Sequence, residues 1–205
     1  MLPKPLHDNM AEVPDEELLH GWKPRLGRLS VPDKIGQAEL LKRQGNLFVH
    51  QNEPKRALRA YAQVFAYVNG LSVVGDAMSQ YAQTTTDLMA TQVQGEQIEA
   101  VKVAVWANMA LCYLRLGVEL DKALKCCQQV LALQPQHSKA RFRKAQALVQ
   151  LKQYERALEL LSALLKEEPK NAAVRKEIRS LQDLKRADDA EIRAKEKQVF
   201  GSIFQ

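Results

Sequence analysis

Apolar residues recur along this chain at spacings of three and four, which is the pattern of amphipathic helices. The segment AELLKRQGNLFV places Ala38, Leu41, Gly45 and Phe48 on one face. The segments VWANMALCYLRLG and RFRKAQALVQL follow the same pattern further along. The sequence therefore predicts three amphipathic helices in these segments.

Each of these helices is followed by a second helical segment, and the second segments repeat with a fixed period. DKALKCCQQVLALQP and ERALELLSALLKEEP carry Ala123 and Ala157, which are 34 residues apart, and each ends in a proline. A third copy, PKRALRAYAQVFAYV, carries Ala57 at the matching place. The period predicts three helix pairs that stack into a solenoid.

Small residues occupy the positions where the two helices of a pair would cross. They are Gly45, Ala57, Ala110, Ala123, Ala145 and Ala157. With the closing prolines Pro135 and Pro169, they resemble the tetratricopeptide repeat from about Asp33 to Pro169. The resemblance implies an all-α solenoid of three helix-turn-helix repeats, with a long insertion between repeats 1 and 2 and a C-terminal capping helix.

The chain is expected to divide into three parts. Residues 1–32 hold five of the eight prolines and are expected to form an irregular lead, with a short helix near Asp15–His20. Residues 33–169 form the repeat domain. In residues 170–205, Val174, Ile178 and Leu181 continue a helical stripe and predict a helix that caps the last repeat.

The insertion follows from the spacing of Ala57 and Ala123, which is 66 residues where one period is 34. Residues 71–97 contain no Lys or Arg, and we expect them to be part helix extension and part exposed loop. Either the insertion is a solvated spacer, or it offers a second contact surface. The apolar residues of such a surface would be Val73, Met78, Tyr81 and Met89.

The first helix of each repeat lines the concave face of such an array, where polar side chains can meet a ligand. Lys42 and Asn46 are four residues apart on one of these helices, as are Lys139 and Arg143 on another, and Asn108 lies between them. Two cations at this spacing repel each other by about 0.2–0.5 kcal/mol. Neither Lys139 nor Arg143 is therefore expected to serve packing, and the set suits a ligand with two carboxylates.

These positions resemble the two-carboxylate clamp of chaperone-binding tetratricopeptide domains. The family motif KxxGN is matched by Lys42, Gly45 and Asn46, the asparagine of the second repeat by Asn108, and KAxxR by Lys139, Ala140 and Arg143. The resemblance implies that Lys42, Asn46, Asn108, Lys139 and Arg143 bind the EEVD-type C-terminus of heat-shock protein 90 or 70. The chain would then be a co-chaperone adaptor. The alternative is a scaffold that binds an internal or helical segment of another protein.

Two families look closer than the rest, the large immunophilins and the tetratricopeptide repeat protein 9 family. Both have a long insertion after the first repeat and an ending of the form KEKxxφxxxF, matched here by KEKQVFGSIF. The immunophilins carry a prolyl isomerase domain ahead of the repeats. The residues ahead of the repeats here show no strand-rich pattern, so the chain resembles the isomerase-free family or an excised repeat domain.

The composition of the chain argues against several classes of protein. Apolar residues make up 46% and charged residues 26% of the chain, which is ordinary for a globular protein. Neither a signal peptide nor an apolar run long enough to cross a membrane is present, so a cytoplasmic protein is expected. The 30 basic and 24 acidic residues are interspersed, so neither nucleic acid nor membrane is an expected partner.

No residue set points to catalysis. The four histidines are dispersed, and the three cysteines form no CxxC pair and are expected to be reduced packing residues. The chain is therefore expected to be no enzyme and to bind no metal or cofactor. The basic C-terminal helix, with Phe200 and Phe204 one turn apart, leaves calmodulin as a further candidate partner, although a capping role is favoured.

Overall fold

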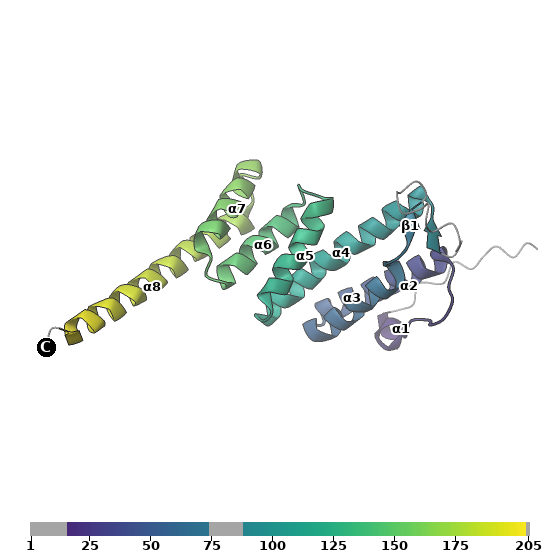
Figure 1. Ribbon diagram of the computed structural model, residues 1–205, viewed down its shortest axis with the longest axis horizontal. Coiled ribbons are helices and arrows are strands. Elements are labelled where there is room, and N and C mark those ends of the chain that lie inside the picture. The colour runs from purple at the N-terminus through teal and green to yellow at the C-terminus, as the bar shows by residue number, and fades with distance from the viewer. Residues whose placement is uncertain (1–15, 74–87, 204–205) are drawn as a thin grey trace, which may run out of the picture.

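The computed structural model describes residues 16–73 and 88–203. Within these ranges the chain forms eight helices and one pair of very short strands (Figure 1). The elements are α1 (Glu16–Gly21), α2 (Val31–His50), α3 (Pro54–Val68), β1 (Ser72–Val73), β2 (Met89–Ala90), α4 (Gln92–Leu116), α5 (Leu120–Leu133), α6 (Ser138–Gln150), α7 (Tyr154–Glu167) and α8 (Ala172–Ile203). The expected all-α class is confirmed.

Three helix pairs follow one another along the long axis of the molecule (Figure 1). They are α2 with α3, α4 with α5, and α6 with α7. The first helices also contact one another in order, α2 against α4 and α4 against α6, and α8 packs on α7 and α6. The predicted solenoid of three repeats with a C-terminal capping helix is therefore confirmed.

Close crossing of the two helices in each pair depends on small side chains. The five alanines predicted at crossing positions, Ala57, Ala110, Ala123, Ala145 and Ala157, are all fully buried. At Gly45 a Cβ atom would lie 2.3 Å from Cε1 of the Tyr61 ring, which is closer than real Cβ contacts. Gly45 therefore lets the ring of Tyr61, on α3, lie directly against the backbone of α2.

The turns inside the repeats require left-handed backbone at three non-glycine residues. Asn52 in repeat 1 and Lys152 in repeat 3 have φ values of 58° and 57°. Repeat 2 uses two left-handed residues, Gly117 at 63° and Glu119 at 52°. This is where LGVELDKA carries an additional residue, so the longer turn takes one more left-handed position and the helix pair is kept.

The insertion includes a short parallel strand pair that leads into an extended helix. Ser72 pairs with Met89, and Val73 pairs with Ala90, which is fully buried. Helix α4 then begins with a capping box in which Thr91 and Gln94 bond to each other's backbone amides. The expected helix extension is thus present, while the expectations for residues 74–87, Met78 and Tyr81 among them, lie outside the described residues.

The N-terminal helix α1 packs against α2 of the first repeat. Leu19 is buried, and the Gln44 side chain donates hydrogen bonds of 2.9 Å to the backbone oxygens of Leu19 and Trp22. These bonds satisfy carbonyl groups at the end of α1 that have no partner within the helix. The short helix expected near Asp15–His20 is therefore present, and the expectations for residues 1–15 lie outside the described part.

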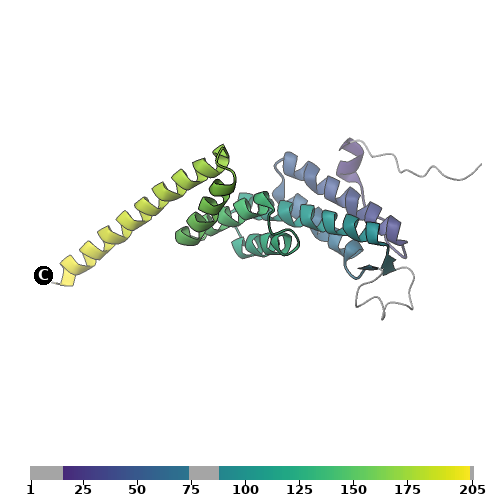
Figure 2. The ribbon, with the colours of Figure 1, turned by 90° about the horizontal axis from the view of Figure 1, so that it is seen from above.

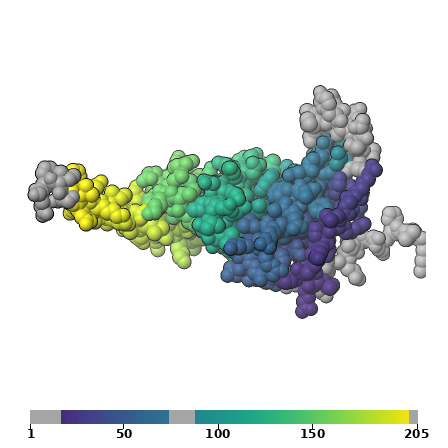
Figure 3. Space-filling model, turned by 60° about the horizontal axis from the view of Figure 1, so that its bottom comes forward, coloured from purple at the N-terminus to yellow at the C-terminus, as the bar shows by residue number. Residues whose placement is uncertain are grey.

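Helix α8 has a packed first half and a projecting second half (Figures 2 and 3). Val174 and Leu181 are buried, whereas every residue from Asp189 to Phe200 is exposed. Among the described residues, no helix is long and apolar enough to cross a membrane. Phe204, the second aromatic of the calmodulin hypothesis, lies outside the described residues.

Candidate functional site

The two asparagines predicted to bind a ligand meet between the first and second repeats. Nδ2 of Asn108 on α4 donates a 2.9 Å hydrogen bond to Oδ1 of Asn46 on α2. The hydroxyl of Tyr61 donates to the same oxygen at 2.7 Å. Because Oδ1 of Asn46 accepts both bonds, the amide of Asn46 is held in one orientation and its Nδ2 remains available as a donor.

The hydroxyl of Tyr61 can donate its hydrogen bond to Asn46 throughout the physiological pH range. Burial raises the pKa of its hydroxyl well above the ordinary value, and the thiol of Cys112 nearby acts in the same direction. The hydroxyl therefore stays protonated across the physiological range. Gly45 and Tyr61 together bring a donor from α3, the outer helix of the repeat, to the asparagine pair on the inner helices.

Arg143 joins this cluster from the third repeat. Its Nη1 donates a 2.6 Å hydrogen bond to the backbone oxygen of Ala107, the residue before Asn108. Burial lowers the pKa of the Arg143 guanidinium, although an arginine side chain keeps its charge in proteins. The expectation that Arg143 serves no packing role is wrong, because its side chain bridges α6 to α4.

The two lysines flank this cluster, each one helical turn before a partner. Lys42 precedes Asn46 on α2, and its Nζ lies 2.5 Å from Oε2 of Glu39. Lys139 precedes Arg143 on α6 and is exposed; within residues 16–73 and 88–203 its side chain makes no hydrogen bond or ion pair. Both residues of the Lys42–Glu39 pair are partly exposed, and an ion pair near the surface contributes only about 0–1 kcal/mol, so a ligand carboxylate can replace Glu39.

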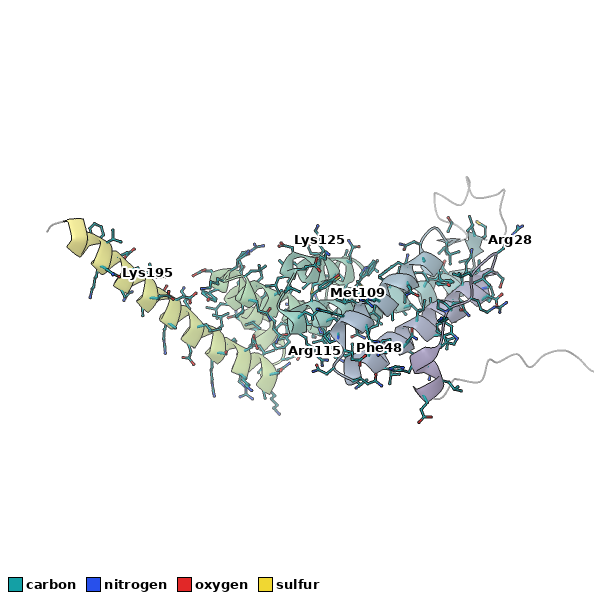
Figure 4. The ribbon with its side chains drawn as sticks, turned by 90° about the horizontal axis from the view of Figure 1, so that it is seen from below. Arg28, Phe48, Met109, Arg115, Lys125 and Lys195 are labelled. Carbon is teal, nitrogen blue, oxygen red and sulfur yellow. The ribbon has the colours of Figure 1, made fainter. Side chains whose placement is uncertain are left out.

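An open cavity of about 490 Å³ adjoins the asparagine pair, and we call it the asparagine cavity. Its walls come from α2 and α4 and include Asn46, Val49, His50, Asn108, Leu111 and Arg115. Nη1 of Arg115 donates a 2.9 Å hydrogen bond to the backbone oxygen of Val49, and Figure 4 shows Arg115 at the end of α4 near Phe48 of α2. The lining of the cavity is thus mostly polar, since Asn52 also belongs to it, and its two apolar residues are Val49 and Leu111.

Sequence reasoning missed two residues of this site. Arg115 lies seven residues, or about two turns, after Asn108 on the same face of α4, so helical spacing could have identified it. No spacing pattern in the sequence could have identified Tyr61, because its hydrogen bond to Asn46 depends on how closely α3 approaches α2. The glycine at position 45 indicated a close crossing but did not say which side chain fills it.

The remaining candidates for chemistry are potential metal ligands and the three cysteines. None of their His, Cys, Asp and Glu side chains gather in groups of three or more that could hold a metal ion. Cys112, Cys126 and Cys127 are free and buried, and burial raises the pKa of these thiols to about 11, 11 and 12 respectively. They therefore remain protonated and serve packing.

Comparisons with known proteins agree with this architecture. Residues 119–182, which span α5 to the start of α8, match the tetratricopeptide repeat family. The C-terminal TPR-containing domain of a putative FK506-binding protein from Plasmodium falciparum superposes with a TM-score of 0.64 at 20% identity, covering 78% of this chain and 97% of that one. Residues 119–182 therefore carry tetratricopeptide repeats, and the described helix pairs together have the fold of a tetratricopeptide-repeat domain. In this domain, α2, α4 and α6 are the first helices of the repeats and present the five predicted residues.

Two further similar proteins have names that state an activity or a bound peptide. Peptidyl-prolyl cis-trans isomerase FKBP42 of Arabidopsis thaliana is 27% identical over 177 residues, which is 86% of this chain and 43% of the relative. The chain thus spans less than half the length of that protein. The second TPR domain of human RPAP3, solved in complex with the HSP70 peptide SGPTIEEVD, superposes with a TM-score of 0.52 at 22% identity, covering 73% of this chain and 98% of that one.

The tetratricopeptide groove offers an anionic ligand two kinds of contact. Lys42, Lys139 and Arg143 supply positive charge from the first and third repeats. Between them, the fixed amide of Asn46 supplies a neutral donor. Charge-assisted hydrogen bonds are about twice as strong as neutral ones, and an amide donor adds direction. Both kinds of contact suit oxygen acceptors such as those of a carboxylate.

Proposed function

We propose that this chain is a cytoplasmic co-chaperone adaptor that binds the acidic C-terminal tail of heat-shock protein 90 or 70. The observation that carries the proposal is the hydrogen-bonded pair Asn46–Asn108, which lies between Lys42 on one side and Arg143 on the other. Such a role is recognition alone and uses no catalytic residue or cofactor. The tail of such a chaperone ends in Glu-Glu-Val-Asp, which places two carboxylates on its last residue.

The two carboxylates of a terminal aspartate have separate places in this groove. Lys42 and Asn46 meet one of them from α2, with Nδ2 of Asn46 as the directed donor. Lys139 and Arg143 meet the other from α6. The next side chain of the tail, a valine, then lies beside the asparagine cavity, where Val49 and Leu111 supply apolar contacts.

The relatives support the same class of partner. The human RPAP3 domain of similar fold has been solved with an HSP70 peptide that ends in EEVD. The Arabidopsis relative is a peptidyl-prolyl cis-trans isomerase, FKBP42, and the immunophilins, which carry a prolyl isomerase domain, were among the families that the sequence resembles. The competing role is a scaffold for an internal or helical segment, and it differs in one respect: only the tail needs a free terminal carboxylate.

A peptide ending in Glu-Glu-Val-Asp should bind with a dissociation constant of roughly 1–100 μM, which corresponds to about −5.5 to −8 kcal/mol. Amidation of the last carboxylate should weaken binding by tenfold or more, because one charge-assisted contact contributes about 1.5–3 kcal/mol. Affinity should also fall as salt is added, since the cations are partly exposed. Isothermal titration calorimetry measures all three. Equal affinity of the free and amidated peptides would favour the scaffold role instead.

Removal of the Tyr61 hydroxyl should weaken peptide binding although Tyr61 touches no ligand in this arrangement. In Tyr61→Phe the ring still fills the space at Gly45, but Oδ1 of Asn46 loses one of its two donors. A neutral hydrogen bond contributes about 0.5–1.5 kcal/mol, so we expect affinity to fall about threefold to tenfold. Tyr113→Phe, at a buried tyrosine of α4 outside this network, is the matched control. Equal losses in both variants would show that orientation of Asn46 is not the cause.

A further inference from the structure

The helix that carries Lys139 and Arg143 begins with a histidine cap. Helix α6 starts at Ser138, and Nδ1 of His137, the residue before it, accepts a 3.1 Å hydrogen bond from the backbone amide of Ala140. Residues in this capping position are most often serine, threonine, aspartate or asparagine. Histidine differs from them because its ring takes up a proton at pH values near neutrality. The cap of α6 can therefore respond to pH.

The capping bond requires the neutral ring of His137. Because Nδ1 accepts the amide proton of Ala140, the ring proton lies on Nε2. A protonated imidazole donates from both nitrogens and accepts from neither, so protonation removes the bond. It also places a positive charge at the N-terminus of a helix, where the helix dipole is positive as well. Ala140 is fully buried, and its amide then keeps only the 3.0 Å bond to the backbone oxygen of His137.

The carboxylates that contact this first turn of α6 keep their charges near neutral pH. Both oxygens of the Glu167 carboxylate, at the end of α7, accept hydrogen bonds from Arg141, and these bonds lower the pKa of Glu167. Hydrogen bonds from Asn171 and Ser138 lower the pKa of Glu168 in the same way. Neither carboxylate therefore gains a proton in the range in which a histidine does.

The other neighbouring helices form no ion pair with this turn within the described part of the chain. Helices α4 and α5 surround Ala140 with apolar residues, which are Val103, Ala107 and Val130. Among residues 16–73 and 88–203, the ion pair that reaches the turn is the one between Arg141 and Glu167 of α7. His137 is therefore the group of this turn whose charge can change near neutral pH.

Lys139 depends on the same turn for its position. It is the second residue of α6, and its side chain makes no hydrogen bond or ion pair within the described residues. Arg143, one turn further on, is instead held by its bond to the backbone oxygen of Ala107. The backbone of the first turn thus determines where the ammonium group of Lys139 lies, whereas Arg143 keeps its place if that turn opens.

We propose that His137 is a positioning residue for Lys139 and makes binding of the acidic tail sensitive to pH. With the neutral ring, the first turn of α6 is closed and Lys139 is in place for a ligand carboxylate. With the protonated ring, the turn opens and the carboxylate loses this partner, so binding weakens as the pH falls. This inference rests on the proposed binding of an acidic C-terminal tail and adds a regulatory element to it.

The test compares His137→Asn with the unchanged chain at about pH 7.5 and about pH 5.5. Asparagine caps a helix through an oxygen that does not titrate in this range. A peptide ending in Glu-Glu-Val-Asp should bind both chains within about twofold at the higher pH. At the lower pH, the unchanged chain should bind it about twofold to fivefold more weakly than the variant, because only the histidine cap is lost. His50 and the peptide are the same in both measurements, so the ratio of the two dissociation constants isolates His137.

Two further variants separate a positioning role from a general effect of histidine or of stability. His20→Asn, at an exposed histidine of α1, is the matched control and should bind like the unchanged chain at both pH values. In a Lys139→Ala background, His137→Asn should no longer change the affinity at the lower pH, because the residue that the cap positions is gone. Nitrogen chemical shifts of the His137 ring should show the proton on Nε2 at the higher pH.

Several results would overturn the role of His137 while carboxylate-dependent binding at the higher pH remains. They are equal affinities of His137→Asn and the unchanged chain at the lower pH, a tighter complex of the unchanged chain there, an undiminished effect without Lys139, and a neutral ring with its proton on Nδ1. A tighter complex would mean that the added charge attracts the peptide more than the lost cap weakens it. No carboxylate-dependent binding at the higher pH would overturn the proposed function itself, and the role of His137 with it.

Discussion

Lys139→Ala should weaken binding of the acidic tail peptide by more than tenfold and leave the fold slightly more stable. The loss follows from removal of one charge-assisted contact, about 1.5–3 kcal/mol. The gain in stability arises because Lys139 is exposed, has no partner among the described residues, and repels Arg143 one turn away, by about 0.2–0.5 kcal/mol. Titration calorimetry and thermal unfolding on the same samples measure both effects.

Lys144→Ala is the matched control for this variant. It removes the same charge from the same helix, five residues further on and on a different face of α6. Its effect on tail binding should be limited to the small loss that a change in net charge causes. If both variants weaken binding equally, the groove attracts the peptide through overall charge and Lys139 makes no specific contact. If Lys139→Ala unfolds the domain, the lysine is structural and its assignment to the ligand fails.

Arg143 would be a less informative choice for the same experiment. Its guanidinium bonds to the Ala107 oxygen and is half-buried, so an alanine there removes a contact between α6 and α4. Loss of such a bond costs about 1–3 kcal/mol of stability in addition to the loss of binding. A weaker complex in Arg143→Ala therefore mixes two causes, whereas Lys139→Ala separates them.

The repeats and the five groove residues could be picked out from the sequence because both follow from the spacing of residues along the chain. A period of 34 residues, alanines at crossing positions and polar residues one turn apart on the first helices are all visible in one dimension. The structure brings Asn46, Asn108 and Arg143 into one cluster. The ligand that they bind remains a prediction, because a groove geometry does not name its occupant.

The contacts that orient the site were not accessible in the same way. Tyr61 reaches Asn46 from a different helix, and Arg143 reaches a backbone oxygen of α4, so each bond depends on interhelix distances. The cavity lined by Phe142 of α6, Leu164 of α7 and Val174 of α8 likewise depends on how α8 packs against α6 and α7. The parallel strand pair of the insertion was also missed, since two residues per strand are too few to show an alternating pattern.

Removal of α8 before Asn171 should destabilise the repeat domain strongly. Val174 and Leu181 are almost fully buried, and burial of such a side chain contributes about 1.5–3 kcal/mol. Their loss, together with the exposure of Leu161 and Leu164 beneath them, should lower the melting temperature on the order of 10 °C. Thermal unfolding followed by circular dichroism measures this shift. An unchanged melting temperature would mean that α8 does not cap the solenoid.

Truncation after Asp188 should cost far less, because the contacts of α8 with the repeats end there. Asp188 accepts a 2.7 Å hydrogen bond from the Tyr154 hydroxyl and lies 3.0 Å from Nζ of Lys152. Residues 189–200, by contrast, are all exposed. Lys195 lies on this projecting half (Figure 4). Leu181→Ala and Ile192→Ala repeat the comparison without shortening the chain. Leu181→Ala should lower the free energy of unfolding by about 2–5 kcal/mol, and Ile192→Ala should change it very little.

If the projecting half of α8 binds calmodulin, Ca²⁺-dependent binding of calmodulin should disappear in the chain truncated after Asp188, while the stability and the tail binding of that chain persist. Comparable losses from the two truncations would mean that the projecting half also supports the fold.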